Sequence, residues 1–215
     1  MTDATTAARL LELGAATLGE SGGRPMRNRI RAAWPGARLA APALPVRCTP
    51  GDNLAIHVGV VRAPAGHALV VTVGDERDLG YWGEVLTTAA EARGIAGLVI
   101  DGCVRDAAAL EAHGFPVFSS GLALPGATKL QPGAVGGAAR VGDVEVSTGD
   151  WVVGDVDGVT VVPGASLEAV LAAGLARAEK EDGFFAALRG GTTTVELLGL
   201  DASLIEAGTD GLEPS

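Results

Sequence analysis

The chain contains few of the side chains from which several common catalytic sites are built. It has two cysteines, Cys48 and Cys103, among 215 residues, which is too few for a disulfide framework. Cys103 follows an apolar run and is expected to be a small core residue. The two lysines are Lys129, in a turn-rich segment, and Lys180, among acids. Both are expected to be solvated, which argues against Schiff-base catalysis, because that chemistry needs a desolvated lysine.

Histidine is also scarce. The three histidines, His57, His67 and His113, are widely spread, so a zinc site of paired histidines or cysteines is not expected. Any metal would be held by oxygen ligands, which favours Mg²⁺ or Mn²⁺. His67 follows a turn and His113 ends a predicted helix, and neither position requires a functional explanation.

Glycine is abundant, but the known phosphate-binding glycine motifs are absent. No two of the 32 glycines are separated by a single residue, and no Gly-Lys-Ser or Gly-Lys-Thr occurs. The first absence argues against a Rossmann dinucleotide site and a glycine-rich S-adenosylmethionine loop. The second excludes a P-loop.

The chain has fewer basic than acidic residues. The formal net charge is -10, with 47% hydrophobic and 20% charged residues, a globular composition that does not favour nucleic acid or an anionic membrane surface as a partner. The basic stretch Arg24–Arg31 is the exception, and we expect a solvated or interface segment there rather than a nucleic-acid arm. Met1–Thr6 is polar, and no apolar run approaches the roughly 20 residues that span a bilayer. The sequence therefore predicts a cytoplasmic protein.

The element pattern predicts an α/β fold. We expect one domain over residues 1–215, with an N-terminal helix and wrapping arm in 1–45 and a tail in 190–215. Alternating helices and strands favour βαβ units and a mainly parallel sheet. The expected helices are Thr6–Glu20, Asn53–Arg62, Gly83–Arg93, Val104–His113 and Ser166–Leu188. The expected strands are Val46–Thr49, Ala68–Val73, Gly97–Ile100 and Pro116–Ser119.

Local signals predict how these elements begin, end and connect. Asp52 and Ser166 are expected to be helix N-caps, and Arg24–Pro45, which contains four prolines, is expected to be a loop. The segment Gly133–Pro163 is expected to form hairpins, whereas Val195–Ser215 has weak structural signals. The expected turns of this hairpin region are Gly142–Asp143, Gly149–Asp150 and Asp157–Gly158.

The stretch from Gly80 to Asp106 is the strongest candidate for chemistry. Twenty residues separate Glu84 from the adjacent pair Arg105 and Asp106. A helix and a buried strand lie between them, so a chain that doubles back can bring two carboxylates and a guanidinium into one pocket. Such a set suits a divalent metal with an anionic substrate. The alternative is structural: Glu84 then complements the helix dipole, and Arg105 with Asp106 forms a surface ion pair.

Two further features bear on the same pocket. Gly80 and Gly83 precede the helix and leave the amides of Val85 and Leu86 open to an anion at the positive helix end. Asn53 and His57, four residues apart on another predicted helix, share a face. They can reach a pocket together or form a surface pair.

Four segments resemble the RraA-like family: PGDNLAIHVGV, WGEVLTTAAEARGIAGLVIDGCVRD, GFPVFSSG and GDWVVGDVDGVTVVP. The resemblance spans roughly Leu10 to Leu188. The family includes metal-dependent 4-hydroxy-4-methyl-2-oxoglutarate / 4-carboxy-4-hydroxy-2-oxoadipate aldolases and non-catalytic regulators of ribonuclease E. The acid and the Arg-Asp pair at this spacing resemble the catalytic members. The resemblance implies a swivelling β/β/α fold, assembled as a homotrimer or hexamer.

The resemblance also implies roles for individual residues. Asp106 is the implied metal ligand and Arg105 the clamp on the pyruvyl group. Glu84 stands where the family usually has aspartate, and its implied role is to orient metal-bound water. The amides of Val85 and Leu86, after Gly83, would receive the substrate carboxylate.

Other implied positions lie farther from this run. Asn53 and His57 match pocket-lining positions of the family. An acid from the C-terminal helix of a neighbouring subunit often completes the site, for which Glu181 is the first candidate and Glu179 the second. The chain departs from the family at Ala109, where catalytic members often carry an acid. This departure leaves the metal coordination and the substrate open.

The predicted function is a class II pyruvate aldolase that uses Mg²⁺ or Mn²⁺. It would cleave a 4-hydroxy-2-oxo acid to pyruvate and a carbonyl product, with oxaloacetate decarboxylation as a side activity. The predicted partner is thus a small 2-oxo acid, not nucleic acid or membrane. Two alternatives remain: a non-catalytic regulator or binding protein on the same fold, and a related metal-dependent lyase of a specialised pathway.

Overall fold

The structure is a computed structural model that describes residues 3–205. The chain divides into two compact units, Met1–Leu175 and Ala176–Ser215. Helix α5 begins in the first unit and ends in the second. No helix within residues 3–205 is long and apolar enough to cross a membrane.

The first unit is built on a nine-stranded sheet with the order β1-β13-β12-β3-β4-β5-β7-β2, and β9 pairs with β3. Strands β3, β4, β5 and β7 are parallel neighbours, and the pairings toward both ends are antiparallel. The strand bounds are β1 Arg24–Pro25, β2 Arg31–Ala32, β3 Leu39–Arg47, β4 Ala68–Thr72, β5 Gly97–Asp101, β7 Val117–Ser119, β9 Ala134–Val135, β12 Trp151–Asp155 and β13 Gly158–Val162. The predicted α/β class with a parallel core is confirmed.

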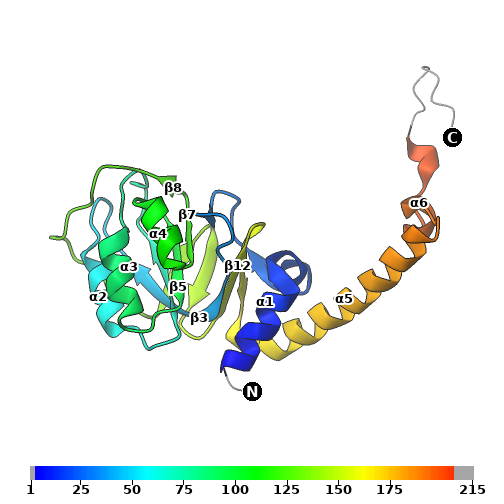
Figure 1. Cartoon of the computed structure of the whole chain (residues 1–215), viewed down its shortest axis with the longest axis horizontal. Helices are drawn as coiled ribbons and strands as arrows, with labels where there is room; N and C mark the ends of the chain where they lie inside the picture. Colours follow the sequence, from blue (N-terminus) through cyan, green and yellow to red (C-terminus); the bar gives the residue numbers. More distant parts are fainter. Residues whose placement is uncertain (1–2, 206–215) are drawn as a thin grey trace. The chain divides into compact units, whose positions relative to one another are not determined.

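Two small sheets and a set of helices complete the chain (Figure 1). The small sheets are β6 Cys103–Val104 with β8 Gly121–Leu122, and β10 Ala138–Val141 with β11 Val144–Ser147. The helices of the first unit are α1 Asp3–Glu20, α2 Leu54–Arg62, α3 Glu84–Glu91, α4 Ala107–His113 and the 3₁₀ turn η1 Gly164–Ser166, followed by α5 Leu167–Arg189. The second unit adds α6 Thr194–Leu198 and η2 Ala202–Leu204.

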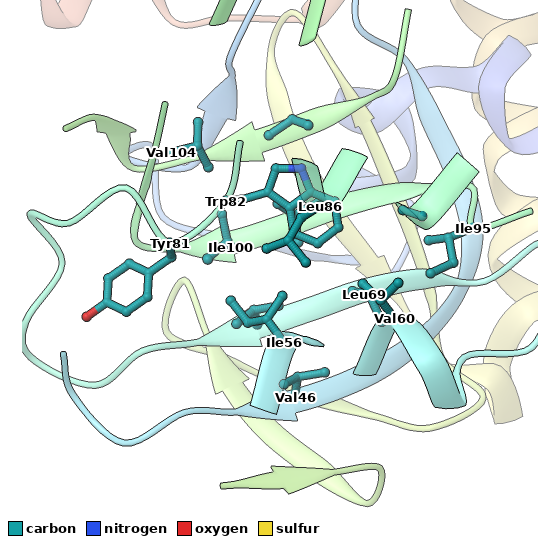
Figure 2. Packing of buried hydrophobic residues seen from close by; sticks show 14 of the residues in the cluster. Val46, Ile56, Val60, Leu69, Tyr81, Trp82, Leu86, Ile95, Ile100 and Val104 are labelled. Atoms are coloured by element: carbon teal, nitrogen blue, oxygen red, sulfur yellow. The ribbon is translucent and has the colours of Figure 1, made fainter. Parts of the chain in front are cut away.

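The parallel strands bury both faces, because neighbouring side chains on a strand point to opposite sides. On β4, Leu69 and Val71 pack under α2, α3 and α4, whereas Ala68 and Val70 belong to a second cluster on the other face. Figure 2 shows the first cluster, with Trp82 turned in beside Leu86. The strand expected at Ala68–Val73 is thus confirmed over Ala68–Thr72, with both of its faces buried.

The predicted loop Arg24–Pro45 is wrong in its second half, where β3 begins at Leu39 and runs through Pro42 and Pro45. The Pro45 carbonyl accepts from Gly136 N, so this edge of the residue faces β9 and not β4. A residue in a strand directs its N–H and C=O to the same side. The missing N–H of Pro45 therefore removes no bond from the β3–β4 ladder.

The basic stretch Arg24–Arg31 is tied to acids of the same chain. Arg24 lies 3.3 Å from Asp150, and Arg27 lies 2.7 Å from Asp143. Arg29 makes a 2.7 Å ion pair with the buried Asp101. These arginines hold the N-terminal segment against the sheet and the β10–β11 turn, so this is not a free basic arm.

Several predicted boundaries of helices differ from those in the structure. The helix expected from Val104 begins at Ala107, since Val104 belongs to β6. Asp52 is not the N-cap of α2; the cap position is Asn53, although Asp52 Oδ1 accepts from Leu54 N at 2.8 Å. Helix α1 is interrupted at Gly14, whose φ of 77° breaks the helical path.

The C-terminal half follows the predictions with three corrections. The turn at Gly142–Asp143 joins β10 to β11, and the turn between β12 and β13 lies one residue before the expected Asp157–Gly158. The turn at Gly149 joins strands of different sheets and makes no hairpin. Ser166 ends η1 immediately before α5. The weak-signal tail contains α6, capped by Thr193 and Glu196, and its last residues lie outside the described part.

Candidate active site

Three chain segments, 80–83, 103–106 and 123–126, run side by side at the carboxyl end of β5. Each is joined to another by backbone hydrogen bonds, so the order of the three is set by the main chain. The bonds are Arg105 N to Trp82 O at 2.9 Å, Tyr81 N to Cys103 O at 3.1 Å, Gly80 N to Pro125 O at 2.7 Å and Ala123 N to Val104 O at 3.0 Å. This edge carries the residues that the sequence singled out.

Glycines form the surface on which the Arg105 side chain lies. A Cβ atom on Gly80 would be 3.0 Å from Arg105 Cδ, and one on Gly126 would be 3.3 Å from Arg105 Nη1. A Cβ atom on Gly83 would be 2.4 Å from Asp106 Oδ2. Any side chain at Gly83 would collide with that carboxylate, so glycine is required there for close approach.

A pocket of about 220 Å³ opens beside this pair. Seven of the residues predicted for the site line it together: Asn53, His57, Gly83, Val85, Leu86, Arg105 and Asp106. These residues come from three separate segments of the sequence, and the fold brings them to one cavity.

Asp106 has an unusual backbone conformation for a residue with a side chain. Its φ of 59° and ψ of 37° are left-handed, a region that aspartate tolerates better than most residues. As the residue before α4 it makes no capping bond there; its Oδ2 instead accepts from Glu84 N at 3.1 Å and lies 3.7 Å from Arg105 Nε. The turn thus directs the carboxylate to the positive end of α3.

Two polar atoms in the pocket have no partner among the described residues: Asn53 Oδ1 and His57 Nε2. Asn53 is buried, and its Nδ2 donates to Tyr81 O at 2.8 Å, which leaves Oδ1 as the free acceptor. The pKa of His57 is lowered, first by burial and then by the charge of Lys129. A buried polar atom is costly unless it is hydrogen-bonded, so these atoms are suited to receive a ligand.

Lys129 also lines the pocket, although the sequence analysis expected only a solvated loop residue. Its segment is held by Asp52, whose Oδ2 accepts from Thr128 Oγ1 at 2.7 Å and from the amides of Leu130 and Gln131. Burial alone would raise the pKa of Asp52, but these bonds and the one from Leu54 N lower it to about 2. The firm anchoring of this loop places an ammonium group beside His57.

The structure does not place every predicted residue in the pocket. The Glu84 carboxylate, 58% exposed, does not line it and lies 3.7 Å from His113 Nε2. Glu181 belongs to the second unit, where it pairs with Arg177 at 2.8 Å, and Glu179 is exposed.

The donor set fits a hard cation that keeps most of its waters. The described residues contain no group of three histidine, cysteine or acidic side chains suited to enclose an ion. Mg²⁺, however, commonly binds through one or two carboxylates and several waters. Asp106, half exposed at the pocket wall, can provide such a carboxylate.

Comparison with known proteins agrees with this architecture. The sequence model of the RraA-like family, described as Aldolase/RraA, matches residues 3–161. A relative from Halalkalibacterium halodurans, named "Putative 4-hydroxy-4-methyl-2-oxoglutarate aldolase", is 34% identical over 134 residues, which are 62% of this chain and 64% of that protein. The chain thus matches less than two thirds of that relative's length.

Solved structures show the same fold. A protein from Pseudomonas syringae superposes with a TM-score of 0.77 at 26% identity, covering 88% of this chain and 94% of that one. RraAS2 of Streptomyces coelicolor, described as an unusual member of the RNase ES inhibitor RraA family, gives a TM-score of 0.73 at 25% identity, covering 84% and 96%.

Proposed function

Because this chain belongs to the RraA-like family, we propose that it is a divalent-metal-dependent aldolase that releases pyruvate from a 4-hydroxy-2-oxo acid. The observation that carries the proposal is the pairing of Arg105 and Asp106 on a glycine floor, in one pocket with unpartnered buried polar atoms. The name of the 34% identical relative supports the same reaction class.

The substrate's 2-oxo acid end would bind at the Arg105 side of the pocket. Within residues 3–205 the guanidinium has no carboxylate at hydrogen-bond distance, since Asp106 is 3.7 Å away. Its planar fork matches a carboxylate. The amides of Val85 and Leu86 at the start of α3 add donors at the positive helix end. Together these groups would fix the keto acid in one orientation.

The far side of the pocket would hold the substituents at C4. Asn53 Oδ1 and His57 Nε2 offer unpaired polar atoms, and Lys129 offers a positive charge. This combination favours a substrate whose C4 carries a hydroxyl and a further carboxylate.

Asp106 would hold Mg²⁺ or Mn²⁺ together with waters. When bound, the ion would supply Lewis-acid polarisation of the 2-keto group. Arg105 would stabilise the negative charge that develops on that oxygen as the C3–C4 bond breaks. Glu84 follows Gly83 of the pocket but does not line it, so it would act on the substrate only through an oriented water that takes the proton from the C4 hydroxyl. Loss of CO₂ from oxaloacetate develops the same charge, so this side activity belongs to the proposal.

The assembly is part of the same proposal. Residues 1–215 would act as one RraA-like domain in a homotrimer or hexamer, with Glu181, or else Glu179, reaching the site of a neighbouring subunit. Size-exclusion chromatography with light scattering would measure the subunit number.

The direct test is a coupled assay for pyruvate across a panel of 4-hydroxy-2-oxo acids and oxaloacetate. Purified protein should release pyruvate with Mg²⁺ or Mn²⁺, lose the activity in EDTA and regain it when metal is restored. Full activity in chelator-treated protein would contradict the metal dependence. No release from any member of the panel would contradict the aldolase and leave a binding or regulatory protein.

A further inference from the structure

One imidazole lies between two carboxylates of the helix that begins at the site. Helix α3 carries Glu84 at its first residue and Glu91 at its last, seven positions apart and therefore on one face. His113, the last residue of α4, places Nδ1 2.8 Å from Glu91 Oε2 and Nε2 3.7 Å from Glu84 Oε1. The ring thus spans the contact between α3 and α4.

His113 is the more confined member of this group. An ionised carboxylate only accepts hydrogen bonds, so the ring interacts favourably with Glu91 and Glu84 only through its N–H groups. The His113 side chain is 25% exposed, against 58% for Glu84. The backbone is also set at this point, since Gly114 ends α4 in a left-handed conformation with its N–H on Glu111 O and Leu110 O.

Glu84 joins this group to the site. Its backbone N–H donates to Asp106 Oδ2, while its carboxylate leaves the helix toward His113. An exposed glutamate at a helix start has several rotamers of similar energy, and an acid that orients a water must hold one direction. The 3.7 Å contact with the less exposed ring favours one of these directions.

We propose that His113 is a positioning residue that sets the direction of the Glu84 carboxylate. The inference rests on the proposed function, because His113 acts through the water-orienting acid of that site. Removing the imidazole would free the carboxylate without altering Arg105 or Asp106. Turnover should therefore fall while substrate affinity and metal affinity are kept.

The test is a double-mutant cycle of His113→Phe and Glu84→Gln in the full-length, Mg²⁺-loaded protein. His113→Phe should lower kcat about tenfold, the low end for residues that support a metal site, with KM within about twofold of wild type. The double variant should be no slower than Glu84→Gln alone, since both changes remove the same function. His113→Gln, which keeps an N–H donor, should recover part of the rate.

His67→Phe is the matched control, because His67 follows a turn before β4 and forms no ion pair with an acid in the described part of the chain. It should leave kcat unchanged. Additive losses in the cycle, or a rise in KM at constant kcat, would overturn the positioning role.

A second measurement needs no turnover. In side-chain ¹H–¹³C spectra of the imidazoles, Glu84→Gln should shift the His113 signal and leave the His67 signal in place. An unchanged His113 signal would overturn the inference, whether or not the protein is active. Absence of pyruvate release by the wild type would instead reject the proposed function.

Discussion

Two aspartates five positions apart, Asp101 and Asp106, are treated in opposite ways by the fold. Asp101 is buried at the end of β5 and accepts hydrogen bonds from Arg29, Arg77, Ser120 and the amide of Gly142. All of its acceptor capacity is used. Asp106 is half exposed and accepts one bond, from a backbone amide.

The two arginines beside these acids differ in the same way. Arg29 grips Asp101 with two bonds of 2.9 and 2.7 Å. Arg105 lies across glycines, and its Nε is 3.7 Å from Asp106 Oδ2. A saturated ion pair stabilises the fold but has little left to offer a ligand, whereas an open pair can exchange water for substrate. The comparison separates a structural centre from a candidate catalytic one.

The largest expected effect is at Asp106. Asp106→Asn keeps the shape and tolerates the left-handed backbone, but it removes the anionic ligand. Metal affinity and pyruvate release should both fall at least about a hundredfold, while the free energy of unfolding changes by less than about 1 kcal/mol. Mn²⁺ titration, the coupled assay and urea unfolding measure the three quantities.

Asp143 provides the matched control for Asp106. It is the other non-glycine residue with positive φ in the described chain, at 63°, and lies in the β10–β11 turn. Asp143→Asn should leave metal binding and activity within about twofold. Equal Mn²⁺ affinity in wild type and Asp106→Asn would leave Asp106 without a metal role.

The second largest effect is expected at Asp101, where a substitution should reduce stability and leave metal binding unchanged. Asp101→Asn should cost about 3 kcal/mol of unfolding free energy, because the arginines lose the buried charge they neutralise. The folded fraction should bind Mn²⁺ as wild type does. Urea unfolding at pH 7 measures the loss. A loss below about 1 kcal/mol would show that the bonded carboxylate is not the structural centre inferred here.

Much of this architecture could be predicted from the sequence, and the misses have physical causes. The parallel strands and the helices before and after them follow from β-branched runs and from turns. Only the end of strand β3 was predicted, by the expected strand Val46–Thr49. Its first part was missed because prolines normally interrupt ladders, and only the position of β9 shows why Pro45 does not. Helix α6 could have been found, since Thr193 and Glu196 have the spacing of a capping box.

The site was predictable where its residues are close in sequence and unpredictable where they depend on distant contacts. The glycines before α3 predicted amides open to an anion at the helix start, and the structure shows that Arg105 and Asp106 also lie close against them. Lys129 was missed because its place depends on bonds from its loop to Asp52, far away in the chain. The contact of Glu84 with His113 joins two helices, and no spacing rule reveals it.

Asp52 is another aspartate whose carboxylate accepts several hydrogen bonds, and its contribution to stability depends on pH. Its pKa, which burial would raise but hydrogen bonds lower to about 2, lies below the value of about 3.9 in an unfolded chain. The ionised Asp52 therefore stabilises the folded state by about 2 kcal/mol above about pH 4. This contribution is lost as the pH falls toward 2.

The Asp52→Asn variant isolates this contribution. Urea unfolding of wild type and variant between pH 6 and 2.5 should show a stability difference that narrows as the pH falls, since the asparagine does not titrate. A difference that stays constant over this range would contradict the lowered pKa.

The smallest expected effect is at Arg105, which forms the open ion pair with Asp106. Arg105→Lys keeps the positive charge but loses the planar fork that grips a carboxylate with two hydrogen bonds. The lysine chain would cross the same glycines, so the fold should be unaffected. We expect kcat/KM for pyruvate release to fall at least about tenfold, or about 1.4 kcal/mol of transition-state stabilisation.

Arg24→Lys is the control for that change, because Arg24 has a similar exposed fraction, 43% against 45%, but pairs with Asp150 away from the pocket. It should keep wild-type kinetics. If folded Arg105→Lys also kept them on the true substrate, the charge alone would suffice at this position. The open ion pair of Arg105 with Asp106 would then be an incidental feature of the glycine floor, and the contrast with Arg29 would lose its functional meaning.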